Sequence, residues 1–208
     1  LGHVSSRLAL ALFATTCALF AVIAVFAISR ISAQTDSPPV VHTSDSPFRG
    51  GTLPPRVHAP EFTLTDQNAK RVSMAEYRGK PVVVTYTYTH CKETCPLQAQ
   101  MIRGALDDVG HDIPALAISV DPFGDTRASA RAFLAKQKMT GRMRYVLGTR
   151  RQLQPVWRGF AIQPQLRDSE HQAYITLVDR NGLQRVAVAI NQTSPEDLAH
   201  DIRVLEKQ

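Results

Sequence analysis

Residues 82–98 read VVVTYTYTHCKETCPLQ, and this stretch decides the fold. Its first seven residues, 82–88, are β-branched or aromatic, which is typical of a buried central strand. Cys91 and Cys95 follow directly, and residues 101–109 then place apolar side chains at helical spacing. The stretch therefore predicts a strand and a helix whose junction carries two thiols.

The chain beyond this junction alternates between strand and helix patterns. Further strands are expected at residues 116–120, 144–147, 173–178 and 184–190, and further helices at residues 126–136, at residues 153–160 and after Ser194. The strand at 144–147 is short, and we expect it at an edge of the sheet. This order, with a hairpin before the last helix, is that of a thioredoxin-like α/β domain, in which helices flank a central mixed sheet.

Local signals mark several boundaries of these elements. Asn181 and Gly182 suit the turn of a hairpin between the last two strands. Ser194 followed by Pro195 is the pattern of a helix N-cap with proline in the first turn. Pro155, in contrast, predicts a late start or a kink in the helix at 153–160.

Composition indicates one globular domain behind an N-terminal extension. The chain has 208 residues, of which 44% are hydrophobic and 20% charged, and these shares are close to ordinary globular usage. Residues 34–58 are rich in Pro and Ser, which favours an extended, solvated tether. Residues 59–208 remain, and they are enough for one well-buried domain.

Residues 1–33 contain an uncharged apolar run between Leu8 and Ile28. A helix of that length measures about 31 Å, which matches the hydrocarbon thickness of a bilayer. A cleaved signal peptide is the alternative, but its apolar region is usually only about 7–15 residues long. We therefore expect a transmembrane signal-anchor, with the globular domain exported.

The two thiols predict metal or redox chemistry. Cys91 and Cys95 lie where a strand ends and a helix begins, and the positive end of a helix dipole favours thiolate there. Pro96 suits the first turn of that helix, because its missing N–H has no intrahelical role. A thiolate binds soft metals or attacks a disulfide.

A distant imidazole could complete a metal site. His171 lies in a polar loop just before the strand at 173–178. Two thiolates and one imidazole suit Cu(I), and a further oxygen ligand could complete a Cu(II) site. Structural zinc prefers four protein ligands, and no fourth stands out. His90 directly precedes Cys91 but is a poorer candidate, because consecutive strand residues face opposite ways.

Four pieces of the chain resemble the Sco/SenC family of copper chaperones for cytochrome c oxidase. They are APEFTLTD at 59–66, YTHC through CP at 88–96, ISVDP with DT at 118–126, and His171 followed by LVD at 177–179. The resemblance implies a thioredoxin-like domain that binds copper through Cys91, Cys95 and His171. It further implies a single-pass inner-membrane protein whose domain lies in the periplasm or the equivalent intermembrane space. The implied partner is the CuA centre of oxidase subunit II or another cuproprotein.

An enzymatic function is the alternative. Cys91 and Cys95 could act without metal as a thiol-disulfide oxidoreductase on partner cysteines, with Cys91 as the nucleophile and Cys95 as the resolving thiol. Metal delivery requires His171, whereas simple dithiol exchange does not.

Residues 126–167 form a basic stretch with ten Arg or Lys and no acidic residue. One interpretation is an ordinary solvated surface. The other is a docking face for an acidic partner or for anionic lipid headgroups. Nucleic acid is disfavoured, because the domain is expected to be exported and aromatic side chains are not interleaved with the charges.

Overall fold

The computed structural model describes residues 46–164 and 173–208. Within these ranges the strands are β1 (Thr63–Asp66), β2 (Arg71–Ser73), β3 (Val82–Thr87), β4 (Ala115–Ser119), β5 (Arg144–Leu147), β6 (Tyr174–Val178) and β7 (Gln184–Ala189). The helices are α2 (Thr94–Val109), α3 (Arg127–Lys136), α4 (Arg150–Gly159) and α5 (Pro195–Glu206), with short 3₁₀ turns at Met74–Tyr77 and Ile190–Gln192. This is the predicted thioredoxin-like α/β fold.

The seven strands form one mixed sheet in the order β2-β1-β5-β4-β3-β6-β7. β3 pairs in parallel with β4, and β4 with β5, while the remaining pairs are antiparallel. All six residues of β3 are buried, as its β-branched and aromatic sequence predicts. β3 is therefore a fully buried interior strand between β4 and β6, and the thiols follow its C-terminal end.

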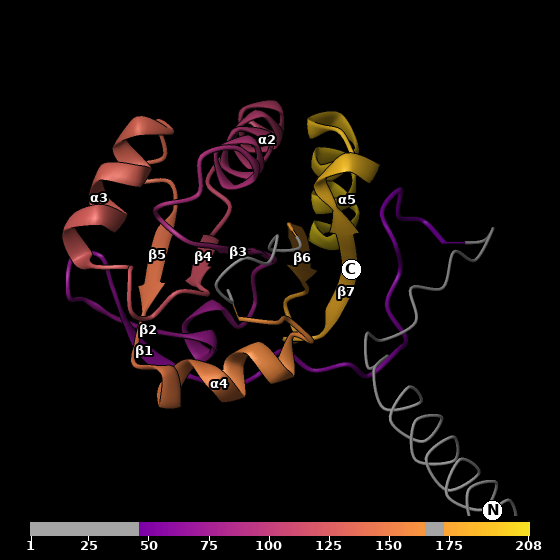
Figure 1. Cartoon of the computed structure of the whole chain (residues 1–208). Helices are drawn as coiled ribbons and strands as arrows, with labels where there is room; N and C mark the ends of the chain where they lie inside the picture. The colour runs from indigo at the N-terminus through magenta and orange to yellow at the C-terminus, as the bar shows by residue number, and fades with distance from the viewer. Residues whose placement is uncertain (1–45, 165–172) are drawn as a thin grey trace, which may run out of the picture. The chain divides into compact units, whose positions relative to one another are not determined.

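Helices cover both faces of the sheet (Figure 1). α2, α3 and α5 share one apolar core on the first face, and α4 packs on the second face with a separate core. The Trp157 indole of α4 donates a 2.9 Å hydrogen bond to the carbonyl of Ser119 at the end of β4. α4 is thus tied to the C-terminal end of β4, at the same edge of the sheet as the thiols.

Several predicted boundaries are confirmed. α2 begins at Thr94, so Cys95 and Pro96 lie in its first turn. The hydroxyl of Ser194 accepts a hydrogen bond from the backbone N–H of Asp197 and caps α5. Gly182 has a φ of 79°, a value that glycine adopts without strain, in the turn between β6 and β7.

One expectation about local structure is wrong, and one of the two alternatives for another is excluded. β5 is not an edge strand, because β1 pairs with its outer side through Thr65–Leu147 and Asp66–Val146. α4 does not start late: it begins at Arg150, where Thr149 and Gln152 form a capping box, and Pro155 lies inside the helix. The alternative, a kink at Pro155, stays a prediction.

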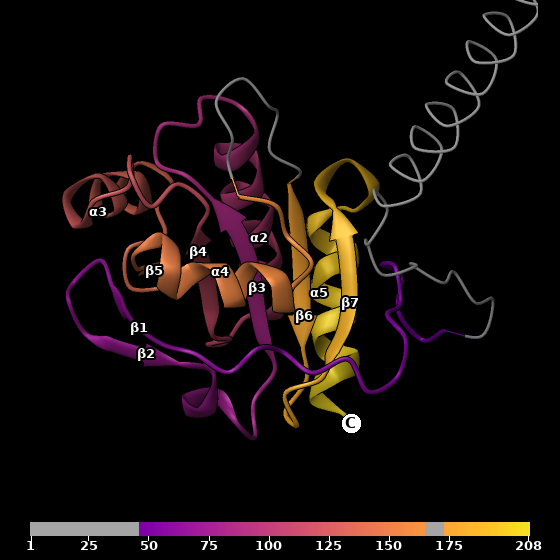
Figure 2. The same cartoon turned by 60° about the horizontal axis from the view of Figure 1, so that its bottom comes forward.

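Residues 46–58 fall within the expected tether, yet they pack against the domain. Thr52 and His58 form isolated bridges with Val186 and Leu183 beside β7, and Figure 2 shows this segment passing the edge of the sheet. The backbone N–H groups of Arg49 and Gly50 donate to the buried carboxylate of Asp201, at 2.7 and 2.8 Å. These residues contribute contacts to the domain and are not simply a solvated spacer.

The expected membrane anchor between Leu8 and Ile28 lies outside the described residues. In the part of the chain that the structure describes, no helix is long and apolar enough to cross a membrane.

Candidate metal and thiol site

The junction between β3 and α2 brings the two predicted thiols together. Cys91 lies in the turn after β3 and is half-buried, whereas Cys95 lies in the first turn of α2 and is only 2% exposed. Both cysteines are free thiols. One sulfur is therefore accessible from solvent and the other is held in the core.

The two cysteines differ strongly in acidity. The Cys95 thiol donates a hydrogen bond to the Cys91 sulfur, and the backbone N–H groups of Cys95 (3.1 Å from Sγ) and Glu93 also donate to it. These donors lower the pKa of Cys91 to about 6, although partial burial opposes them. The hydrogen bond to Cys91, together with burial, raises the pKa of Cys95. At neutral pH Cys91 is therefore the thiolate and Cys95 the thiol.

Tyr88 adds a further donor to the thiolate. Burial and the charge of Cys91 raise the pKa of Tyr88 to about 12, so its hydroxyl stays protonated at neutral pH. That hydroxyl makes a hydrogen bond that favours the charged form of Cys91.

A network of hydrogen bonds beneath the thiols fixes their loop. The Asp125 carboxylate accepts hydrogen bonds from the backbone N–H of Thr89 (2.7 Å), the hydroxyl of Ser119 (2.6 Å) and the hydroxyl of Tyr145 (2.8 Å). The Thr89 hydroxyl also donates to the hydroxyl of Ser129 in α3, at 3.0 Å. The turn carrying Cys91 is thus tied to β4, β5 and α3.

A buried hydroxyl, that of Thr87, lies beside the thiols. The Thr87 hydroxyl is buried, and its hydrogen bond with the Cys95 side chain opposes the rise in the pKa of Cys95. It faces the same small buried space as Cys95. Two convergent sulfurs in this neighbourhood fit a soft metal ion.

The two candidate histidines, His171 and His90, differ in what the structure says of them. His171 lies outside the described residues, so its position relative to the thiols stays a prediction. His90 is exposed in a turn beyond β3, so the strand-alternation argument against it does not apply. Its ring faces Asp121 and Asp125, a grouping that the sequence did not indicate, because some thirty residues separate His90 from these carboxylates.

Part of the basic stretch is engaged in internal contacts. Arg131 donates to the carbonyl of Gln67 at 2.8 Å, Arg142 to Asp107 at 2.6 Å, and Arg144 to the buried Asp66 at 2.9 Å. These three side chains are engaged in contacts within the domain, so fewer basic groups of the 126–167 stretch are free for docking.

Chemically, the site supports two reactions. A half-buried thiolate beside a protonated thiol can bind a soft metal ion, with release of the second proton. The same pair can exchange with a disulfide, because the low pKa of Cys91 makes it a nucleophile and Cys95 lies within reach to resolve it.

Comparison with known proteins helps to separate the two alternatives, metal binding and disulfide exchange. Over 135 residues the chain is 32% identical to Protein SenC of Rhodobacter capsulatus, a match that covers 61% of this chain and 60% of SenC. Over 108 residues it is 25% identical to the mitochondrial Protein SCO1 homolog of Homo sapiens, covering 49% of this chain and 35% of the human protein. The chain thus spans between about a third and three fifths of the length of these relatives.

A solved structure extends the likeness to nearly a whole domain. Bradyrhizobium japonicum ScoI, solved with copper bound, is 27% identical with a TM-score of 0.60, and the match covers 71% of this chain and 99% of that one. A model of the SCO1/SenC family matches residues 51–206, which is most of the chain. The resemblance seen in the sequence is therefore confirmed, and the chain belongs to the SCO1/SenC family.

Proposed function

We propose that this chain is a membrane-anchored copper chaperone that binds copper through Cys91, Cys95 and His171. It passes the ion to the CuA centre of cytochrome c oxidase subunit II or to another cuproprotein. The segment between Leu8 and Ile28 anchors it in the inner membrane, and the domain works in the periplasm or the equivalent intermembrane space.

The observation that carries the proposal is the contact between Cys95 and Cys91. A thiolate with a pKa of about 6 is available as a copper ligand without added base, and the second sulfur lies within hydrogen-bond reach. Soft sulfur ligands select Cu(I). Copper bound to the related ScoI supports assigning the same cargo here.

Transfer proceeds by ligand exchange. The Cys91 sulfur is partly exposed, so an incoming thiolate of the acceptor can approach an ion held there. Cys95 is buried and retains the ion until the acceptor has supplied its own ligand. A site with three protein ligands leaves a coordination position open for this exchange.

The test is a Cu(I) titration of the full chain under reducing conditions against a chromophoric Cu(I) chelator. We expect one tightly bound ion in the parent and weaker binding in His171→Ala. The matched control is His111→Ala, because His111 is an exposed histidine paired with Glu206. Equal binding by all three proteins would remove His171 as a ligand, and no binding by the parent would remove the chaperone function.

The second candidate function, a thiol-disulfide oxidoreductase, is favoured by the unequal acidity of the thiols. In that reaction the Cys91 thiolate attacks a partner disulfide and releases one partner thiolate. Cys95 then loses its proton and attacks the mixed disulfide, which leaves a Cys91–Cys95 disulfide and a reduced partner. A His171→Ala variant that keeps full disulfide reductase activity while the parent binds no copper would place this function first.

A further inference from the structure

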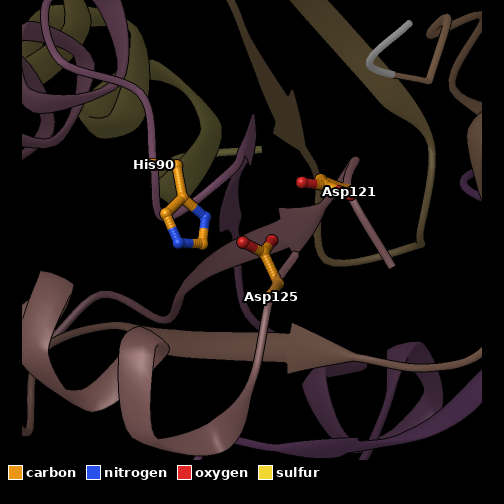
Figure 3. A group of neighbouring side chains, drawn as sticks. All are labelled: His90, Asp121 and Asp125. Atoms are coloured by element: carbon orange, nitrogen blue, oxygen red, sulfur yellow. The ribbon is translucent and has the colours of Figure 1, made fainter. Parts of the chain in front are cut away.

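A second group of potential metal ligands lies beside the thiols. His90 comes from the turn after β3, and Asp121 and Asp125 from the loop between β4 and α3. One ligand atom from each lies within 4.8 Å of the others, and Figure 3 shows the imidazole facing both carboxylates. We propose that these three side chains form a binding site for a borderline divalent cation such as Zn²⁺, separate from the copper site.

The carboxylates have lone pairs to offer. Asp121 Oδ1 accepts hydrogen bonds from the backbone N–H groups of Phe123 and Gly124, at 3.2 and 3.0 Å. Its Oδ2 has no hydrogen-bond partner among the described residues. Asp125 Oδ1 accepts the backbone N–H of Thr89, and the Thr89 side chain also makes a hydrogen bond to this carboxylate. Asp121 therefore retains an oxygen that can coordinate an ion, and Asp125 would coordinate one in place of one of its hydrogen bonds.

The group also lacks a neutralising cation. Within the described ranges, neither Asp121 nor Asp125 forms a salt bridge with a lysine or arginine, although Arg127 begins the next helix. His90 makes no direct contact with either carboxylate in the same ranges; its Nδ1 lies 3.4 Å from the Thr89 hydroxyl. Three ligands thus face one another across a gap, and a bound cation would offset two neighbouring negative charges.

Gly124 keeps this gap open. Its φ does not lie in the left-handed region, so the backbone conformation does not require glycine here. A Cβ at this position would lie 2.2 Å from Asp121 Oδ2 and 3.4 Å from His90 Nδ1. The absence of a side chain therefore allows the carboxylate and the imidazole to approach the same point.

The ligand types separate the two sites chemically. One imidazole nitrogen and two carboxylate oxygens suit Zn²⁺ and similar divalent ions, and three protein ligands leave positions for water. The thiols prefer soft Cu(I). Because His90 directly precedes Cys91, an ion held here would also fix the turn that carries the exposed thiolate.

The test removes the thiols first. In the full chain with Cys91→Ser and Cys95→Ser, Zn²⁺ is titrated by calorimetry, alone and after adding His90→Gln, Asp121→Asn or the control His111→Gln. His111 also pairs with one carboxylate, Glu206, but is not part of a three-ligand group in the described chain. Asp125 stays unchanged, because its hydrogen bonds hold the loop.

We expect one Zn²⁺ bound by the thiol-free chain and by the control. Loss of a supporting hydrogen bond to a metal ligand already weakens binding about 10–100-fold, so His90→Gln and Asp121→Asn should each weaken it by at least about tenfold. Equal affinity in all four proteins, or no binding by the thiol-free chain, would overturn the proposal. Thermal unfolding without metal checks that each variant is folded. This Zn²⁺ titration is independent of the proposed copper function, because both thiols are absent from every protein in it.

Discussion

The Asp125 carboxylate accepts a 2.7 Å hydrogen bond from the backbone N–H of Thr89, two residues before Cys91. The same carboxylate accepts the hydroxyl groups of Ser119 and Tyr145. Burial raises the pKa of Asp125, and these three donors oppose that shift. One side chain therefore links the thiol turn to the C-terminal end of β4 and to Tyr145 of β5, and a small displacement of this carboxylate would alter the position of Cys91.

Asp125→Ala should lower the free energy of unfolding by about 2–4 kcal/mol. The substitution leaves buried or partly buried donors on Thr89, Ser119 and Tyr145 without a hydrogen-bond acceptor. Urea unfolding measures the loss. The control is Asp108→Ala, which breaks an exposed pair with Arg203 and should cost at most about 1 kcal/mol. A similar loss in both variants would contradict the anchoring role of Asp125.

Cys91 should react with iodoacetamide with a half-maximal rate near pH 6, since its pKa is lowered to about 6. Below that pH the thiol is protonated and the rate falls; above it the rate reaches a plateau. Cys95 should react slowly at every pH below 9, because burial and Cys91 raise its pKa. Peptide mapping by mass spectrometry separates the two cysteines.

The matched variant for this measurement is Cys95→Ala. It removes the thiol that donates to the Cys91 sulfur, so the inflection for Cys91 should move upward, toward the ordinary cysteine value of about 8.5. An inflection above pH 8 in the parent, or one that the substitution leaves in place, would show that Cys95 does not control the acidity of Cys91.

Local sequence signals were sufficient to predict those elements whose structure depends only on neighbouring residues. The β-branched run of β3 and the cap at Ser194 depend on neighbouring residues, and both were predicted. The internal position of β5 was missed, because its outer partner β1 lies some eighty residues earlier and is only four residues long. Short strands carry too little periodicity to reveal such a pairing.

The candidate site likewise combines one contact that the sequence predicts with another that it does not. Cys91 and Cys95 are four residues apart, so a strand–helix junction brings them together. The grouping of His90 with Asp121 and Asp125 depends on the parallel pairing of β3 with β4, which places the ends of both strands at one edge of the sheet. Spacing along the chain contains no direct signal for that contact.

Arg144→Ala should destabilise the domain by about 2–4 kcal/mol at pH 7, because Asp66 is a buried carboxylate that Arg144 contacts at 2.9 Å. Burial acts to raise the pKa of Asp66, but the backbone N–H groups of Asn68 and Lys70, together with Arg144, lower it below its ordinary value. The charged carboxylate therefore stabilises the fold above pH 4, and this contribution is lost as the pH falls through the lowered pKa.

The difference between parent and Arg144→Ala should consequently shrink as the pH falls below 4, where protonated Asp66 no longer needs the guanidinium group. Unfolding in urea at a series of pH values measures this difference. Arg142→Ala is the control, since Arg142 pairs with the exposed Asp107; it should cost little at any pH. A constant difference across the series would exclude Asp66 as the cause.

Leu97 and Phe123 are the two large apolar side chains that lie exposed in the described chain, at 57% and 82%. Leu97 follows Cys95 by two residues, and Phe123 lies in the loop between Asp121 and Asp125. Both therefore flank the thiol edge of the sheet, where a copper acceptor must dock under the proposed function. Exposed apolar side chains of this kind often supply the central contacts of an interface.

Leu97→Ala and Phe123→Ala should each leave Cu(I) affinity unchanged and alter the free energy of unfolding by no more than about 0.5 kcal/mol. Copper transfer to a soluble CuA domain of oxidase subunit II, followed by stopped-flow absorbance, should slow by roughly tenfold. The control is Lys80→Ala, an exposed position before the opposite end of β3. If transfer keeps its parent rate in both apolar variants, the acceptor approaches Cys91 from another side.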